Sequence, residues 1–256
     1  MNETLQVIEN RRSVRTYSNQ SVTRAEKNLI LKATFRAPTA GNLMLYSIIE
    51  VKKQKLKDRL AITCDNQPFI ARAPYVLLFL ADYQRWFDYF EHCEVKKHLG
   101  GLKVLYRKPQ AGDLLLACCD ALIAAQTAAI AAESLGIGSC YIGDILERYE
   151  IHRELFNLPP YVVPITLLCF GHPTPGLRIN RTPRFGKQAI VHQNIYHRFE
   201  GNELEQVFHE KEKQFTNAPH PSEFNNAGQF IYSQKFAADF TVEMNRSVKE
   251  MLKNWK

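Results

Sequence analysis

An alanine- and leucine-rich run at residues 112–136 constrains the fold more than any other feature of the sequence. It reads GDLLLACCDALIAAQTAAIAAESLG and contains no proline. Alanine and leucine are strong helix formers, and a helix of about 24 residues is roughly 36 Å long. Gly136 is a natural C-terminal stop. Apolar residues cover nearly every face, so we expect a central helix that is buried on most sides.

A membrane span is the alternative interpretation of this run, because its length suits a bilayer. Polar and acidic residues recur through it, however, and charges at bilayer depth are costly; they are Asp113, Asp120, Gln126 and Glu133. We therefore prefer the core helix of a soluble protein. Its buried polar groups then need hydrogen-bond partners, and a second subunit is one source of them.

Composition favours an ordinary globular protein. The 256 residues suit one large domain or two small ones, with 45% hydrophobic and 23% charged residues. The formal net charge of +7 suits anionic ligands such as phosphates. Nucleic-acid binding is the weaker interpretation, because the sequence has neither zinc-finger spacing nor a long basic run.

The cysteines and the N-terminus point to a reducing compartment. No CxxC pair occurs among the six cysteines, which argues against a structural zinc site, and we expect no metal. The opening residues MNETLQVIENRR lack an apolar signal region. We therefore expect a cytoplasmic protein whose thiols are mostly free.

An arginine-rich segment, RRSVRTY at Arg11–Tyr17, follows a short expected helix at residues 4–10. As an isolated motif it suits a solvated charged turn. It also suits a phosphate grip, because alternate side chains of an extended segment point the same way. Arg11 and Ser13 would then share one side, and guanidinium and hydroxyl groups both donate to phosphate oxygens.

The first half of the chain predicts alternating helices and strands. The capping-box pattern at residues 23–26 begins a helix that stops before Pro38. The small-residue loop that follows, at residues 38–42, either lets a ligand approach the backbone or is an ordinary turn. We expect further elements as follows: strand 46–51, helix 55–62, a polar loop at 65–69, and strand 75–81 buried on both faces.

The second half is less regular. Residues 82–110 are expected to be helical and irregular, and their aromatic side chains suit a lid, a subunit contact or simple packing. Pro164 places the strand at 162–170 at a sheet edge or at a bulge. A strand at 139–142 and helices at 147–156, 203–215 and 232–255 complete the expected elements. We divide the chain into a core at 1–186 and a helical extension at 187–256.

The order of several motifs resembles the FMN-dependent nitroreductase and flavin reductase family, most nearly its oxygen-insensitive, NADPH-preferring branch. The motifs are RRSVR, APTAGN, DNQPF, ESLGIGSCYIGD, FGHP and TPRF, within residues 5–200. The resemblance implies an α+β fold: a mixed, mainly antiparallel sheet flanked by helices. It also implies an intertwined homodimer with FMN at the subunit interface and a C-terminal helical extension.

The resemblance assigns the cofactor's phosphate to Arg11 and Ser13, with Arg12 nearby and Arg184 reaching it from the far end of the core. Arg15 would face the pyrimidine edge of the flavin. A fixed cation there stabilises the negative charge that two-electron reduction places near N1 and O2.

Five further residues are implied to contact the flavin. Thr39 would contact it from the partner subunit, and Gln67 would hydrogen-bond its pyrimidine edge. Ile142, Gly143 and Asp144 would lie along the ring, with a backbone N–H near N5. The flavin performs the chemistry, so we assign no catalytic acid or base.

Two positions depart from the family pattern. Thr182 stands where a lysine is common, and the neighbouring Arg181 is a candidate substitute for its charge. Asp144 stands where the family often has a second glycine, and an acidic side chain beside the flavin would affect its redox properties or substrate access.

The resemblance implies an oxidoreductase that passes electrons from NAD(P)H to nitroaromatics, quinones or free flavin by a ping-pong mechanism. A non-catalytic flavin-binding or flavin-storage protein remains the alternative. A Rossmann dehydrogenase is disfavoured, because the glycines at 136 and 138 follow a helix and Tyr141 replaces the third glycine. We expect no nucleic-acid or membrane partner.

Overall fold

The computed structural model describes residues 1–100, 102, 104–177 and 182–255. The chain divides into two compact units, residues 1–179 with 243–256, and residues 180–242. The first unit holds the sheet and the long apolar helix, and the second is built from helices.

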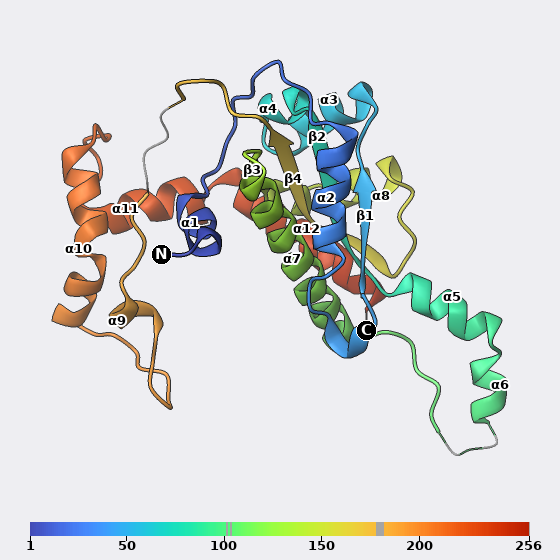
Figure 1. Ribbon diagram of the computed structural model, residues 1–256. Helices are drawn as coiled ribbons and strands as arrows, with labels where there is room; N and C mark the ends of the chain where they lie inside the picture. The colour runs from blue at the N-terminus through green and yellow to red at the C-terminus, as the bar shows by residue number, and fades with distance from the viewer. Residues whose placement is uncertain (101, 103, 178–181, 256) are drawn as a thin grey trace. The chain divides into compact units, whose positions relative to one another are not determined.

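Within the described ranges, the first unit contains one sheet of four antiparallel strands in the order β1-β2-β4-β3 (Figure 1). The strands are β1 Tyr46–Glu50, β2 Tyr75–Asp82, β3 Gly138–Ile142 and β4 Val162–Gly171. The mainly antiparallel sheet that the resemblance implies and the predicted positions of the strands are therefore confirmed. β3 lies at one end of the sheet, and this position decides where the candidate site forms.

Pro164 lies in an internal strand, because β4 pairs with both β2 and β3. The register passes from Phe79 opposite Thr166 to Leu80 opposite Pro164, which leaves Ile165 as an extra residue. The predicted bulge is thus present and the edge position is wrong. A bulge accommodates a proline inside a sheet because the proline has no N–H to donate to the ladder.

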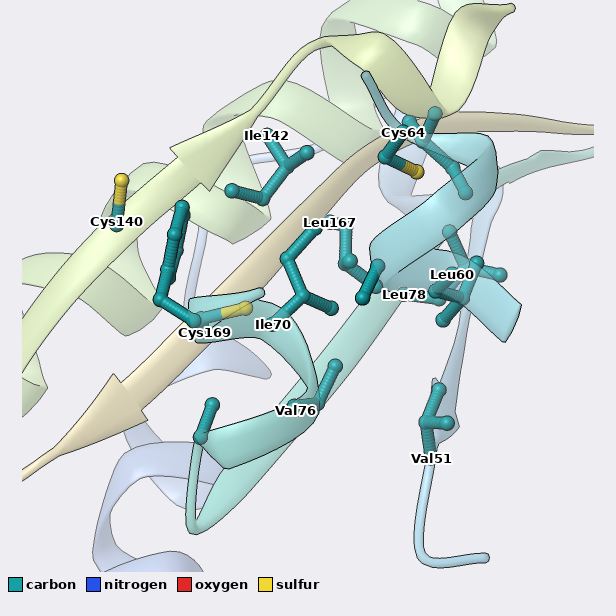
Figure 2. Packing of buried hydrophobic residues seen from close by; sticks show 14 of the residues in the cluster. Val51, Leu60, Cys64, Ile70, Val76, Leu78, Cys140, Ile142, Leu167 and Cys169 are labelled. Carbon is teal, nitrogen blue, oxygen red and sulfur yellow. The ribbon is translucent and has the colours of Figure 1, made fainter. Parts of the chain in front are cut away.

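Two hydrophobic layers cover the two faces of the sheet. Leu77 and Phe79 of β2 pack with one layer, whereas Leu78 and Leu80 pack with the other, as the alternation of strand side chains requires. Figure 2 shows the second layer, in which Leu78 lies with Ile70 and Leu167. β2 is therefore buried on both faces, as its continuous apolar sequence predicts.

The long apolar run forms α7, Ala111–Ser134, which packs on the face of the sheet that carries Leu77. A stripe of alanines is fully buried, but Leu115 and Leu122 on other faces are 68% and 46% exposed. We expected α7 to be buried on most sides, but within a single chain it is buried only on the side that carries the alanines. The small alanine side chains at the positions that face the sheet allow α7 to pack closely on the strands.

Asp120 of α7 finds its partners inside the same chain. Its carboxylate accepts hydrogen bonds from the Thr39 hydroxyl and from the backbone N–H groups of Ala40 and Leu45, the latter two at 3.0 Å. Gln126 accepts from the Tyr141 hydroxyl at 3.1 Å. Among the described residues α7 alone has the length and hydropathy of a membrane span, but this buried polar network is typical of a core helix.

Further helices complete the first unit. The Thr23–Glu26 capping box is confirmed, with the Thr23 N–H donating to the Glu26 carboxylate at 2.7 Å and the Glu26 N–H donating to the Thr23 hydroxyl at 3.2 Å. The elements are α1 Glu3–Asn10, α2 Arg24–Thr34, η1 Ala40–Asn42, α3 Gln54–Thr63, α4 Phe69–Arg72, α5 Gln84–His92, α6 Val95–Leu99, η2 Asp144–Leu146 and α8 Tyr149–Leu155.

The irregular stretch expected at residues 82–110 contains α5 and α6. A salt bridge connects its end to the start of α7. The Arg107 guanidinium donates to both carboxylate oxygens of Asp113, in the first turn of α7. Its aromatic side chains include Phe87, whose ring lies 5.4 Å from that of Tyr161. At least part of this stretch therefore packs on the core.

The second unit begins the C-terminal helical region. Its elements are α9 Lys187–Ile190, α10 Asn202–Asn217, α11 Ala227–Ile231, the π-helical turn η3 Tyr232–Phe236 and the start of α12 Asp239–Met251, and η4 Leu252–Asn254 follows. The single helix expected at 232–255 is thus interrupted near residue 237. The end of α12 belongs to the first unit, where the Ser247 hydroxyl accepts the Tyr149 N–H at 2.9 Å.

Candidate functional site

The arginine-rich segment lies against the free edge of β3. Ser13 forms a parallel bridge with Ser139, and the Val14 N–H donates to the Ser139 carbonyl at 3.0 Å. Further along, the Ser18 N–H donates to the His172 carbonyl at 2.9 Å. Residues 11–17 are therefore an extended segment fixed by the sheet, and the solvated-turn interpretation is wrong for this part of the chain.

Gly138 makes this approach possible. A Cβ at position 138 would lie 2.7 Å from Val14 Cβ, much closer than real carbon atoms approach one another. The same holds at Gly171, where an added Cβ would lie 2.6 Å from the Tyr17 ring. Each glycine thus removes a side chain where the arginine segment crosses a strand end.

Arg11, Ser13 and Arg15 gather around Cys140 of β3. Burial raises the pKa of the Cys140 thiol, whereas the Arg15 charge, a hydrogen bond with Ser13 and the Arg11 charge act in the opposite direction. Arg12 instead lines a hollow of about 530 Å³ with Asn10 and others, and its guanidinium donates to the Asn10 carbonyl. Burial raises the pKa of Glu133, which lines the same hollow, whereas the charges of both Arg11 and Arg12 act in the opposite direction.

Arg11 carries a buried nitrogen that is ready for an anion. Among the described residues its Nη1 atom is shielded from solvent and has no hydrogen-bond partner. A buried donor without a partner costs free energy. A negatively charged oxygen of a ligand would accept its hydrogen bond and remove that cost. Together with the adjacent Ser13 hydroxyl, Arg11 fits the phosphate of a cofactor such as FMN.

Gln67 and Asp144 meet across the sheet edge. The Gln67 side-chain amide donates to the Asp144 carboxylate at 2.7 Å and to the Cys64 carbonyl at 3.0 Å. Asp144 begins η2 directly after Gly143, which is exposed, while Ile142 at the end of β3 is 1% exposed. The sequence-predicted residues Gln67, Ile142, Gly143 and Asp144 thus form one cluster.

Arg15 connects the arginine segment with this cluster. Its guanidinium carbon lies 5.7 Å from the centre of the Phe69 ring, in the cation–π range, and Phe69 begins α4 two residues after Gln67. The stacking directs a positive charge toward the Gln67 loop. This arrangement suits an anionic edge of a planar ligand.

The structure adds Glu147, which the sequence did not single out. This side chain is 4% exposed and its Oε1 atom has no hydrogen-bond partner among the described residues. Burial, followed by the charges of Asp144 and Asp65, raises its pKa to about 7. No sequence signal marks Glu147, because its burial arises from the packing of η2 against distant segments.

His152 supports the loop that carries Asp144 and Glu147. Its Nδ1 lies 3.0 Å from the Ile145 carbonyl, which only accepts, so Nδ1 carries the proton. Its Nε2 lies 2.9 Å from the Thr63 hydroxyl. Burial lowers the pKa of His152 to about 4, so the neutral ring joins α8, η2 and α3 at physiological pH.

Two predicted site residues lie apart from this cluster. The Thr39 hydroxyl donates to Asp120 and accepts from the Met44 N–H at 2.9 Å, so it is engaged where the loop after α2 meets α7. Arg184 is an exposed residue of the second unit, and its role at a phosphate stays a prediction. Arg181 lies outside the described residues, and Thr182 is exposed.

No group of three or more His, Cys, Asp or Glu side chains within the described ranges is arranged to hold a metal ion. The arrangement around β3 combines guanidinium and hydroxyl donors with the Gln67 amide and the Asp144 carboxylate. Such a set binds phosphate and a planar ligand with polar edges.

Comparisons with known proteins identify the family. The sequence pattern of the Nitroreductase family matches residues 8–172. The chain is 33% identical over 196 residues to an FMN reductase (NADPH) of Bacillus subtilis (strain 168), covering 77% of this chain and 75% of that protein. It is 31% identical over 198 residues to the oxygen-insensitive NADPH nitroreductase of Salmonella typhimurium, with the same shares covered.

The structural comparison extends over the whole chain. The solved structure of the NfrA1 nitroreductase from B. subtilis has a TM-score of 0.82 and 26% sequence identity, covering 99% of this chain and 100% of that one. The family match, the relatives and the fold agree with one another. This protein belongs to the nitroreductase family.

Proposed function

We propose that this protein is an FMN-dependent oxidoreductase that passes electrons from NAD(P)H to nitroaromatics, quinones or free flavin. The curated relatives are an NADPH-dependent FMN reductase and an NADPH nitroreductase. The observation that carries the proposal is the buried Arg11 Nη1 atom, which has no hydrogen-bond partner among the described residues. Its segment also carries Ser13 and is fixed to β3 by the bridge between Ser13 and Ser139. FMN when bound takes a hydride from NAD(P)H and gives its electrons to the second substrate.

In this proposal the residues of the chain bind and orient the cofactor. Arg11 and Ser13 hold the phosphate, and Arg12 lies near it. Arg15, held against Phe69, offers a fixed positive charge to the pyrimidine edge, where reduction of a flavin places negative charge.

The ring contacts come from separate parts of the chain. Gln67 binds the pyrimidine edge, and Ile142, Gly143 and Asp144 lie along the ring. Thr39 reaches the cofactor of the partner subunit. The proposed division of the chain stays a core at residues 1–186 and a helical extension at 187–256.

A homodimer in the cytoplasm completes the proposal. One feature supports the dimer: a stripe of large apolar side chains is exposed on α7, including Leu115, Leu122 and Ile123. Burial of such a stripe against a second copy is favourable. Sedimentation should give about twice the 29.5 kDa mass of one chain.

The test is an anaerobic titration of the purified protein with added FMN. We expect a yellow complex that NADPH or NADH bleaches and that a quinone or nitroaromatic restores. Parallel titrations with the two nucleotides give the preference between them. Protein that stays colourless and does not bind FMN contradicts the proposal, and bound FMN without NAD(P)H turnover indicates the flavin-storage alternative.

A further inference from the structure

Hydrogen bonds fix the orientation of the Gln67 side-chain amide. Both hydrogens of its NH₂ group are engaged, one by the Cys64 carbonyl at 3.0 Å and one by the Asp144 carboxylate at 2.7 Å. A carbonyl oxygen and an ionised carboxylate only accept hydrogen bonds. Rotating the amide by 180° would turn its own oxygen toward two acceptors, so the observed orientation is enforced.

The carbonyl oxygen of the same amide is therefore the group left for a ligand. Among the described residues, no hydrogen bond to Gln67 Oε1 occurs. The backbone holds the residue in place, because the Gln67 N–H donates to the Ala61 carbonyl at 2.7 Å. Asp65 and Asn66 immediately before it have φ values of 56° and 48°, a tight turn that fixes the approach of the chain.

Asp144 is itself held at a fixed position. It begins η2, and the Glu147 N–H donates to its carbonyl at 3.1 Å. The next residue, Ile145, accepts the His152 Nδ1–H at 3.0 Å. A glycine at position 144 would offer no side-chain acceptor, so the partner of Gln67 depends on the aspartate.

We propose that Asp144 is a positioning residue, which locks the Gln67 amide with its carbonyl oxygen toward the cofactor. The site then selects a planar ligand that presents an imide N–H at this edge, as the N3–H of FMN does. The inference rests on the proposed FMN site and deepens it. It assigns to Asp144 a hydrogen-bonding role that depends on an acceptor atom and not on the negative charge.

The experiment compares FMN with 3-methyl-FMN, in which a methyl group replaces the N3 hydrogen. Binding to the apoprotein is followed by quenching of flavin fluorescence. We expect the wild-type protein to bind FMN about tenfold more tightly, the value of one hydrogen bond to a ligand. In Asp144→Ala only the Cys64 carbonyl still opposes rotation of the Gln67 amide. The ratio of the two dissociation constants should therefore fall at least about threefold.

Two further variants separate the hydrogen bond from charge and from folding. Asp144→Asn keeps an acceptor oxygen without the charge and should restore the wild-type ratio. Asp144→Gly, which carries the residue common in the family, should behave like the alanine variant. A matched control is Asp58→Ala, because the exposed Asp58 also accepts from a glutamine amide, that of Gln54 at 2.7 Å, and its loss should leave the ratio unchanged.

Each outcome decides between the two levels of the proposal. If wild-type apoprotein does not bind FMN, the proposed function fails. If it binds FMN but the alanine and glycine variants keep the wild-type ratio, the role of Asp144 is overturned while the function stands. If Asp144→Asn loses the ratio as alanine does, the charge is responsible and the positioning role is likewise overturned.

Discussion

Val14 and Gly138 touch where the arginine-rich segment crosses the start of β3, and the contact leaves no room for a side chain at position 138. A Cβ there would lie 2.7 Å from Val14 Cβ. The segment that carries Arg11, Ser13 and Arg15 therefore reaches the edge of the sheet only because residue 138 is a glycine.

Gly138→Ala should displace this segment. We expect the free energy of unfolding to fall by about 1–3 kcal/mol, typical of overpacking, and FMN binding to weaken. Chemical denaturation and flavin titration measure the two effects. Gly112→Ala in α7 is the control, because a Cβ added at that position would meet no atom within 4 Å; its stability should stay equal or rise by up to about 1 kcal/mol. Wild-type behaviour of Gly138→Ala would contradict the argument.

Arg11→Met should change stability and cofactor binding in opposite directions. The substitution removes a buried nitrogen that has no partner among the described residues, so the apoprotein should be as stable as wild type or more stable by about 1–3 kcal/mol. The affinity for FMN should fall about tenfold or more, because a charge-assisted bond to phosphate is lost. Thermal denaturation of the apoprotein and flavin titration measure these quantities.

The control for Arg11 is Arg24→Met, at an exposed position in the first turn of α2. It loses the same charge without touching the sheet edge, so both quantities should match wild type. A destabilised Arg11→Met apoprotein with unchanged FMN affinity would show that Arg11 serves the fold alone.

Asp120→Asn should weaken the junction between α7 and the loop after α2. The carboxylate accepts from the Thr39 hydroxyl and from the Ala40 and Leu45 N–H groups, whereas an asparagine turns an NH₂ group toward one of these donors. We expect a loss of about 2–3 kcal/mol in the free energy of unfolding, measured in urea. The exposed Asp88, which accepts from Gln84 at 2.7 Å, provides a control substitution to asparagine that should change stability little.

Glu147 should make stability depend on pH near neutrality. Burial and the charges of Asp144, Asp65 and Glu243 raise its pKa from 4.5 to about 7, against the opposing charge of Arg148. The folded protein thus retains this proton where the unfolded chain has lost it. The stabilisation is complete below about pH 4.5 and is lost as the pH rises through about 7.

Glu147→Gln removes this titration. The free energy of unfolding of the variant minus that of wild type should therefore increase by on the order of 1–2 kcal/mol as the pH rises from 4.5 to 8.5. Urea denaturation of both proteins across this range measures the difference. The buried His152, whose pKa is lowered to about 4, acts oppositely in both proteins because stability falls as acid charges the ring. Parallel pH profiles of the two proteins would contradict the role of Glu147.

Much of the fold follows from local sequence patterns. The alanine-rich run predicts α7, and the Thr23–Glu26 capping box predicts the start of α2. Alternating and continuous apolar runs predict all four strands of the described sheet within about two residues. These features depend on neighbouring residues, whose propensities and periodicities are visible in the sequence.

The C-terminal helices follow less closely from local patterns. The helix expected at 232–255 contains a π-helical turn and a break before α12. The last residues of the chain pack within the first unit. Trp255, for example, is 1% exposed and packs at 5.5 Å from Tyr161.

The sequence by itself determined which groups are available at the site, because arginines, a serine and a glutamine stand at recognisable positions. Tertiary structure decided what each group contacts. Asp120 accepts a hydrogen bond from Thr39 of its own chain, Asp144 accepts one from the Gln67 amide, and Glu147 is buried. The physical reason is that hydrogen bonding and desolvation depend on segments far apart in the chain, such as residues 67 and 144. Their meeting depends on strand order and packing, which local sequence patterns do not specify.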